Sequence, residues 1–191
     1  MVRIIIFSSI FLLSGVALSQ EIYIQPGLLK STGTISPSTM LNRGVQNYYL
    51  SGFLEYYVDK KLSFRGDLMY FMDGKSKTGT DNLFFKEGFR TYFGVFYHTG
   101  KKNWDNYVGI EPGIAVFKPL ASIDPNARLQ ASPSFAVHIG STYYIWKFFN
   151  FFVDVAYVNS TYRGLSFGSE KTDELILSAG LGFNLQTRKK K

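Results

Sequence analysis

From residue 22 to its C-terminal end, the chain alternates apolar and polar residues in stretches of about ten residues. The last stretch is the clearest, because one of its two faces consists of Leu175, Leu177, Ala179, Leu181, Phe183 and Leu185. Successive side chains of a β-strand point to opposite sides, so each stretch predicts a strand with one apolar and one polar face. Many such strands in series predict a membrane barrel that turns its apolar face outward.

Residues 1–19 have the pattern of an export signal. Arg3 precedes an apolar run, and small residues, Ala17 and Ser19, occupy the positions that a signal peptidase reads. The alternative is an N-terminal membrane anchor, but the apolar run is short and is interrupted by three serines. We therefore expect a signal peptide over 1–19, cleaved after Ser19.

The remaining composition fits one barrel domain, expected over 20–187, followed by a basic periplasmic tail at 188–191. Aromatic residues make up 17% of the chain, and there is no cysteine that could form a disulfide or a thiolate metal site. Of the net charge of +7, one unit belongs to Arg3 and four belong to the tail, so the body carries little excess charge. No nucleic-acid partner is expected.

Eight strands are predicted, near 21–32, 46–58, 62–73, 83–98, 104–118, 131–146, 150–160 and 173–186. Short turns at 59–61, 100–101 and 147–150 alternate with longer polar loops at 33–45, 74–82, 119–130 and 161–172. Outer-membrane barrels have short periplasmic turns and long outward loops, so both termini are expected in the periplasm. The predicted fold class is all-β: a closed, antiparallel, eight-stranded up-and-down transmembrane β-barrel.

The outward, lipid-facing side is expected to begin with Ile22, Ile24, Pro26 and Leu28 in the first strand and to include Phe85 in the fourth. Trp104 and Trp146 adjoin predicted turns, where an aromatic belt would place them. Proline removes a donor from the strand ladder, so we expect a bulge or a local break at Pro26 and at Pro112.

Charged residues fall on the inward face. The set comprises Glu55, Arg65, Asp67, Lys86, Arg90, Glu111, His138, Asp154 and Glu174. The predicted turns place Glu55 opposite Arg65, Arg90 opposite Glu111, and Asp67 beside Arg90. We interpret this set as a structural network, because eight strands enclose a space that side chains can fill. No catalytic, cofactor or metal site is expected.

Two short stretches carry a family resemblance. Tyr97–Gly100 and Asn106–Gly113 resemble the central hairpin of small outer-membrane β-barrel proteins of the OmpA-transmembrane or OmpX-like type, common in Bacteroidota. The ending Gly180–Leu185 resembles the C-terminal strand signal of such barrels. This resemblance implies a monomeric outer-membrane protein. Its implied partners are membrane lipid and lipopolysaccharide, the barrel assembly machinery, and a surface ligand bound by the loops.

Two other classes of function remain open. One is a lipid-A-modifying barrel enzyme, which needs a nucleophile and a base. His98 has no acid beside it in sequence, and Ser141 falls on the opposite face from His138, so this chemistry is disfavoured. The other is a secreted lipocalin-like carrier of a lipophilic ligand, in which the two faces would be reversed.

Overall fold

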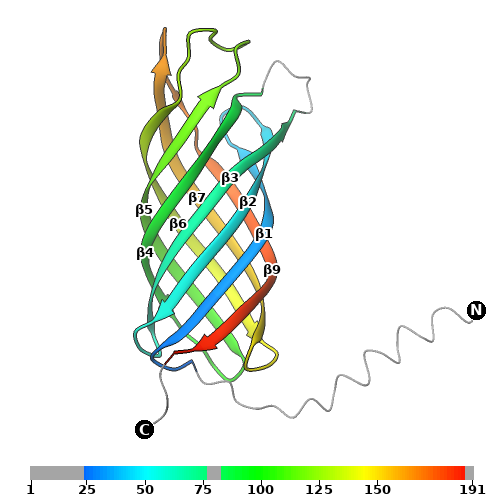
Figure 1. The fold of residues 1–191 in the computed structure, drawn as a ribbon, viewed down its shortest axis with the longest axis vertical. Coiled ribbons are helices and arrows are strands. Elements are labelled where there is room, and N and C mark those ends of the chain that lie inside the picture. The colour runs from blue at the N-terminus through cyan, green and yellow to red at the C-terminus, as the bar shows by residue number, and fades with distance from the viewer. Residues whose placement is uncertain (1–23, 77–82, 188–191) are drawn as a thin grey trace, which may run out of the picture.

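The computed structural model describes residues 24–76 and 83–187, so the predicted signal peptide and the basic tail lie outside the described residues. Its strands are β1 (Leu28–Met40), β2 (Val45–Tyr57), β3 (Leu62–Lys75), β4 (Phe85–His98), β5 (Trp104–Pro119), β6 (Gln130–Tyr144), β7 (Phe149–Leu165), β8 (Gly168–Lys171) and β9 (Glu174–Gln186). All pairings are antiparallel. Around the ring the order is β1-β2-β3-β4-β5-β6-β7-β9, and β9 pairs with β1 to close it, while β8 pairs with β7 alone. The predicted closed, eight-stranded transmembrane barrel is confirmed (Figure 1).

The barrel has two unlike ends. Leu28 at the start of β1 pairs with Gln186 at the end of β9, so the first and last strands meet at one end. That end, here called the turn end, also carries the short β2–β3, β4–β5 and β6–β7 turns, at the bottom of Figure 1. The opposite, loop end carries the longer connections and β8. Within the described residues there is no helix long and apolar enough to cross a bilayer.

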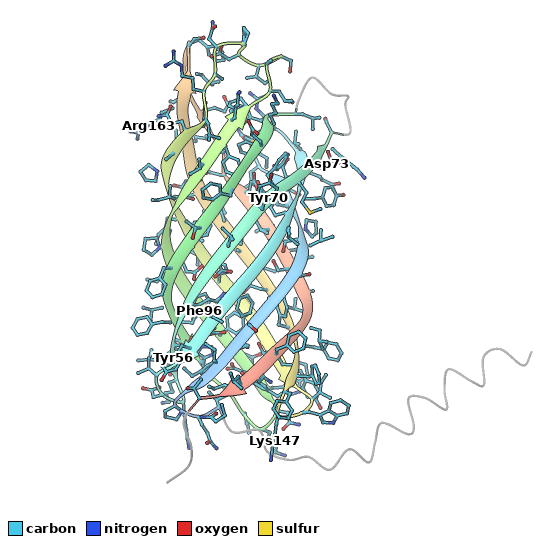
Figure 2. All side chains as sticks on the ribbon, viewed as in Figure 1. Tyr56, Tyr70, Asp73, Phe96, Lys147 and Arg163 are labelled. Atoms are coloured by element: carbon cyan, nitrogen blue, oxygen red, sulfur yellow. The ribbon has the colours of Figure 1, made fainter. Side chains whose placement is uncertain are left out.

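The outer wall is apolar. In β9 the odd-numbered residues from Leu175 to Leu185 are exposed, and Phe64, Phe93, Ile139 and Phe151 project from other strands in the same way. Figure 2 shows this layer of rings and aliphatic chains standing away from the ribbon. A soluble carrier would expose its charges and hide these side chains, so the reversed arrangement is wrong for this chain.

The first strand differs from its prediction. It runs over Leu28–Met40 rather than 21–32, and the expected loop at 33–45 is reduced to a tight turn at 41–44. Of the supposed lipid-facing residues, Ile24 and Leu28 are buried, Pro26 lies in a turn before the strand, and Ile22 lies outside the described residues. Because the lumen accepts small polar side chains, Ser and Thr at 31–39 continue a strand instead of ending it.

Two more predictions fail at the loop end. The ladder between β4 and β5 shifts between Phe85 and Glu87, so Phe85 is buried and Lys86 is exposed, the reverse of what was expected. The expected loop at 161–172 is instead a hairpin, in which β7 continues to Leu165 and turns back as β8.

The expected break at Pro112 is local. Paired residues of β4 and β5 stop at Tyr92–Gly113 and resume at Val95–Ile110 without a change of register, whereas β5–β6 pairing runs through Pro112 uninterrupted. Gly94 lies in this gap, where an added Cβ would come within 2.0 Å of the Ile110 carbonyl oxygen and 2.7 Å of Glu111 Cα. The close approach of the two strands therefore depends on glycine at 94.

We predict that Gly94→Ala lowers the free energy of unfolding by about 1–3 kcal/mol, because the neighbouring backbone must move. Gly33→Ala is the matched control, since a Cβ at Gly33 meets no atom within 4 Å. Urea titration of protein refolded in phospholipid vesicles measures both. Equal stability of the two variants would contradict the close contact.

Candidate functional site in the barrel interior and at the loop end

The turn end of the interior holds what we call the His98 cluster: Lys30, Glu55, His98 and Asp105, all buried. Lys30 Nζ lies 2.6 Å from Glu55 Oε2. His98 Nδ1 lies 2.9 Å from Asp105 Oδ2, and His98 Nε2 lies 3.0 Å from Glu55 Oε1. Nδ1 is hydrogen-bonded to Asp105, whereas Nε2 is hydrogen-bonded to Ser63 Oγ, which in turn donates to Glu55.

Sequence reasoning missed the partners of His98. Asp105 is seven residues away in sequence, across the β4–β5 hairpin, and Ser63 Oγ on β3 lies 2.8 Å from His98 Nε2. The alternation of strand β5 puts Asp105 inward, so the correct hairpin register would have revealed this contact. Ser63 also donates to Glu55 Oε1 at 2.6 Å.

The middle of the interior holds the Arg65 cluster. Arg65 donates twice to Asp67, at 2.8 Å through both Nε and Nη2, and its Nη1 lies 3.4 Å from Asp154. Asp154 Oδ1 in turn lies 2.9 Å from His138 Nδ1. Glu111 Oε2 lies 3.1 Å from His138 Nε2, but the angle is poor and Glu111 has no hydrogen bond to the described residues. The guanidinium of Arg65 stacks on Phe53 at 3.6 Å.

The Arg90 cluster fills the interior towards the loop end. Arg90 Nη2 lies 3.1 Å from Glu174 Oε1, and both side chains are fully buried. Glu174 also accepts hydrogen bonds from Ser38, Asn47 and Tyr49 at 2.8–3.0 Å. The guanidinium of Arg90 lies 4.9 Å from the Phe117 ring centroid.

The structure places eight of the nine expected inward residues inside the barrel, and only Lys86 is exposed. The eight are Glu55, Arg65, Asp67, Arg90, Glu111, His138, Asp154 and Glu174. Glu55 does pair in register with Arg65, although its ionic partners are Lys30 and His98. The predicted pairing of Arg90 with Glu111 is wrong, because Arg90 faces Ala115, and the predicted place of Asp67 beside Arg90 is also wrong, because Asp67 faces Tyr92.

Side chains fill the lumen along its length. Tyr57, Phe96, His138, Arg90 and Val45, from turn end to loop end, have no exposed surface. Side chains therefore fill the described interior densely at each of these levels. Among the described residues no group of three or more His, Asp and Glu side chains is placed to hold a metal ion.

The loop end carries a packed cap, defined here as the 120–129 loop, the β7–β8 hairpin and Arg43. Asp124 accepts hydrogen bonds from the backbone N–H groups of Ser166 and Asn126, and the bond from Ser166 above all holds the pKa of Asp124 below its usual range. Arg43 pairs with Glu170 at 3.1 Å. These contacts tie segments from different parts of the chain into one surface.

Aromatic packing supports the cap from below. Phe84 and Tyr162 are buried edge to face at 5.9 Å, and the Tyr162 hydroxyl donates to the Arg128 carbonyl. Leu129, in the 120–129 loop, and Phe167, in the β7–β8 turn, are 57% and 69% exposed. Arg128 and Arg163 are also exposed, and Figure 2 shows Arg163 at this end of the barrel. The cap thus exposes apolar and cationic side chains on segments that are held in place by hydrogen bonds and aromatic packing.

Comparison with known proteins places the fold. No family model and no curated protein matches the chain. Among solved structures it is similar to the outer membrane protein OprG from Pseudomonas aeruginosa, with a TM-score of 0.61 and 16% identity over 85% of this chain and 98% of that one. It is also similar to Neisserial surface protein A (NspA), with a TM-score of 0.62 and 12% identity over 83% of this chain and 96% of that one. For the N-terminal β-barrel domain of Pseudomonas aeruginosa OprF, the TM-score is 0.51 and the identity is 15% over 84% of this chain and 98% of that one. The chain has the fold of small outer-membrane eight-stranded barrels.

We predict that Glu174→Gln lowers the free energy of unfolding by about 3–5 kcal/mol, because it leaves the Arg90 cation buried without its counter-charge. The double variant Arg90→Met/Glu174→Leu should recover most of this loss. Glu87→Gln, at an exposed carboxylate on β4, is the matched control. Urea unfolding in vesicles provides the measurement, and a loss below about 1 kcal/mol for Glu174→Gln would refute the buried pair.

Proposed function

We propose that this chain is an integral outer-membrane protein without enzymatic activity, in which the barrel is a scaffold and the cap is a binding surface. The observation that carries the proposal is the contrast between the two regions. The interior is closed by its own side chains, whereas the cap holds exposed residues on a hydrogen-bonded frame. We therefore expect a ligand to bind at an end of the barrel. The loop end is favoured because the cap extends beyond the strands of the wall there.

The apolar outer wall supports a location in the bilayer. Exposed rings and aliphatic side chains cover all eight strands of the wall, and every wall strand has a partner on both sides. In hydrocarbon only helices and closed barrels satisfy their backbone polar groups. The shared fold of outer-membrane barrels and the expected export signal both favour the outer membrane over other bilayers.

The chemistry of the cap favours an amphipathic, anionic ligand. Arg128 and Arg163 have no carboxylate within 4 Å among the described residues, and the exposed Phe167 and Leu129 add apolar surface. Arginine binds phosphate oxygens through paired N–H groups. Lipopolysaccharide, which carries phosphates beside acyl chains, is the partner that this combination fits.

We predict that Arg128→Gln/Arg163→Gln weakens lipopolysaccharide binding about tenfold, because two charge-assisted contacts to phosphate are lost. The chain has no cysteine, so a fluorophore on Ser169→Cys in β8 reports binding at the cap alone. Titration of refolded protein with purified lipopolysaccharide gives the affinity.

The matched control for this titration is Lys60→Gln/Lys61→Gln at the turn end, which should leave the affinity unchanged. Lipopolysaccharide stripped of phosphate should bind the parent protein as weakly as intact lipopolysaccharide binds the arginine variant. Unchanged affinity in the arginine variant would exclude the cap as the binding surface.

One observation favours a catalytic alternative. His98 contacts Ser63 through Nε2 and Asp105 through Nδ1, at the distances of a base between a nucleophile and an orienting acid. Against this, the Ser63 hydroxyl donates its hydrogen bond to Glu55 instead of to His98. The side chains of these three residues and of Asp105 are at most 1% exposed. An acyl substrate has no access to a serine in this position, so we assign these contacts to structure.

We predict that a fluorophosphonate probe does not label Ser63 in the folded barrel, because the hydroxyl is sealed from solvent and its proton is held by a carboxylate. Mass spectrometry of protein folded in detergent measures the labelling, with Ser63→Ala giving the background. Labelling of Ser63 in the parent that disappears in His98→Asn would overturn the non-enzymatic assignment.

A further inference from the structure

Exposed lysines gather at the turn end of the barrel. They are Lys60 and Lys61 in the β2–β3 turn, Lys101 and Lys102 in the β4–β5 turn, and Lys147 in the β6–β7 turn. Figure 2 shows Lys147 at the foot of the barrel. All three short turns contribute, so the charges follow the rim across six of the eight wall strands. We call these five residues the lysine rim.

Among the described residues, the only exposed carboxylate beside the lysine rim is that of Asp59. Within the described residues no carboxylate oxygen lies within 4 Å of any of its five amines. Asp59 Oδ1 accepts hydrogen bonds from the backbone N–H groups of Lys61 and Leu62 at 2.6 and 2.8 Å and so shapes the turn. Its single negative charge leaves four of the five lysine charges in excess among the described residues. The other acids at this end, Glu55 and Asp105, are buried in the His98 cluster.

The rim lies at the level of the lipid headgroups. Val58 and Leu62, which flank Lys60 and Lys61, are lipid-facing and 45% and 42% exposed. Trp104 and Trp146 adjoin the other lysines and are 55% and 62% exposed, as expected for interfacial anchors. A strand advances about 3.3 Å per residue, and each lysine is one to three residues from a lipid-facing side chain. Its side chain is long enough to carry the amine to the level of the phosphates.

The backbone at Lys102 adds a second observation. Lys102 has φ of +57°, and it is the only residue other than glycine with positive φ among the described residues. Glycine is preferred in this left-handed conformation because the Cβ of an L-residue crowds the backbone there, and asparagine is tolerated because its side chain can hydrogen-bond locally. A two-residue turn built on Lys102 and Asn103 therefore keeps a cation where the backbone alone would favour a glycine.

From these observations we propose that the lysine rim binds the headgroups of anionic phospholipids in the leaflet that faces the turn end. Five unpaired amines held at phosphate height attract an anionic surface, and each lysine near such a surface contributes independently. Peptidoglycan also carries carboxylates, but the short turns hold the amines at the bilayer rather than beyond it. The proposal needs only the transmembrane barrel and does not depend on a ligand at the cap.

The two tryptophans of the chain, Trp104 and Trp146, both lie beside the rim and make the test local. Protein lacking residues 1–19 is refolded into vesicles that contain brominated phosphatidylglycerol or brominated phosphatidylcholine in a background of the other lipid. Bromine quenches only a nearby indole, so the quenching curves give the relative affinity of the turn end for the two headgroups. The parent should prefer phosphatidylglycerol about three- to tenfold, and 0.5 M salt should weaken this preference.

The test variant is Lys60→Gln/Lys61→Gln/Lys101→Gln/Lys102→Asn/Lys147→Gln, which should quench equally with either lipid. The control removes five cations from the loop end, at Lys75, Lys86, Lys118, Arg128 and Arg163, and should keep the parent's preference. A gel shift on boiling verifies that both variants are folded.

Two results would overturn the proposal. One is equal quenching by the two lipids in the parent, and the other is a preference that survives in the rim variant. If the parent shows no lipid preference but sediments with purified peptidoglycan in a lysine-dependent way, the rim belongs to the cell wall instead. Loss of lipopolysaccharide binding at the cap would leave this result untouched, so the two proposals fail separately.

Discussion

Backbone pairing between β1 and β9 is the interaction on which the rest of this molecule depends, because it closes the sheet and removes its edges. In hydrocarbon a free N–H or C=O group has no water to bind, so an open sheet cannot persist there. The pairing covers Leu28–Thr32 and resumes at Ser38–Met40. Between these segments side chains take over, since Thr34 Oγ1 donates to the Ala179 carbonyl at 2.8 Å and Ser36 and Ser178 share a hydrogen bond of 2.6 Å. Small hydroxyl residues in β1 are thus part of the closure.

Closure also explains the charges inside. Eight strands enclose a space that side chains fill, and the alternation of each strand sends every second residue into it. Three lysine or arginine cations, Lys30, Arg65 and Arg90, are buried there with six carboxylates among the described residues. Two histidines lie between pairs of those carboxylates and bring the balance closer to neutral when they are protonated. The network holds register across strands distant in sequence, which apolar packing alone would specify less strictly.

The sequence determined most of this fold through alternation alone, which located the wall strands and identified the inward charges. Alternation did not determine register. The short Asp59–Lys61 turn placed Glu55 opposite Arg65 correctly, whereas a turn centred at 100–101 displaced β5 by four residues and hid Asp105 from His98. Composition misled at residues 33–40, where Ser, Thr, Gly and Pro suggested a loop although they form a strand whose Ser36 and Ser38 face the lumen. The cap could not be foreseen, because its contacts join the 120–129 loop to a hairpin that has no local signal.

The proposed location of function follows from the same closure. Most side chains inside the barrel are engaged in the contacts that hold its register. We therefore propose that binding takes place at the two ends. At the loop end, backbone hydrogen bonds to Asp124 and the buried pair Phe84 and Tyr162 support a shaped surface. At the turn end, short hairpins can only present single side chains at the bilayer surface, and the chain places lysines there. The long connections of the loop end can thus form a shaped surface, whereas the short turns of the turn end can present only separate charged side chains.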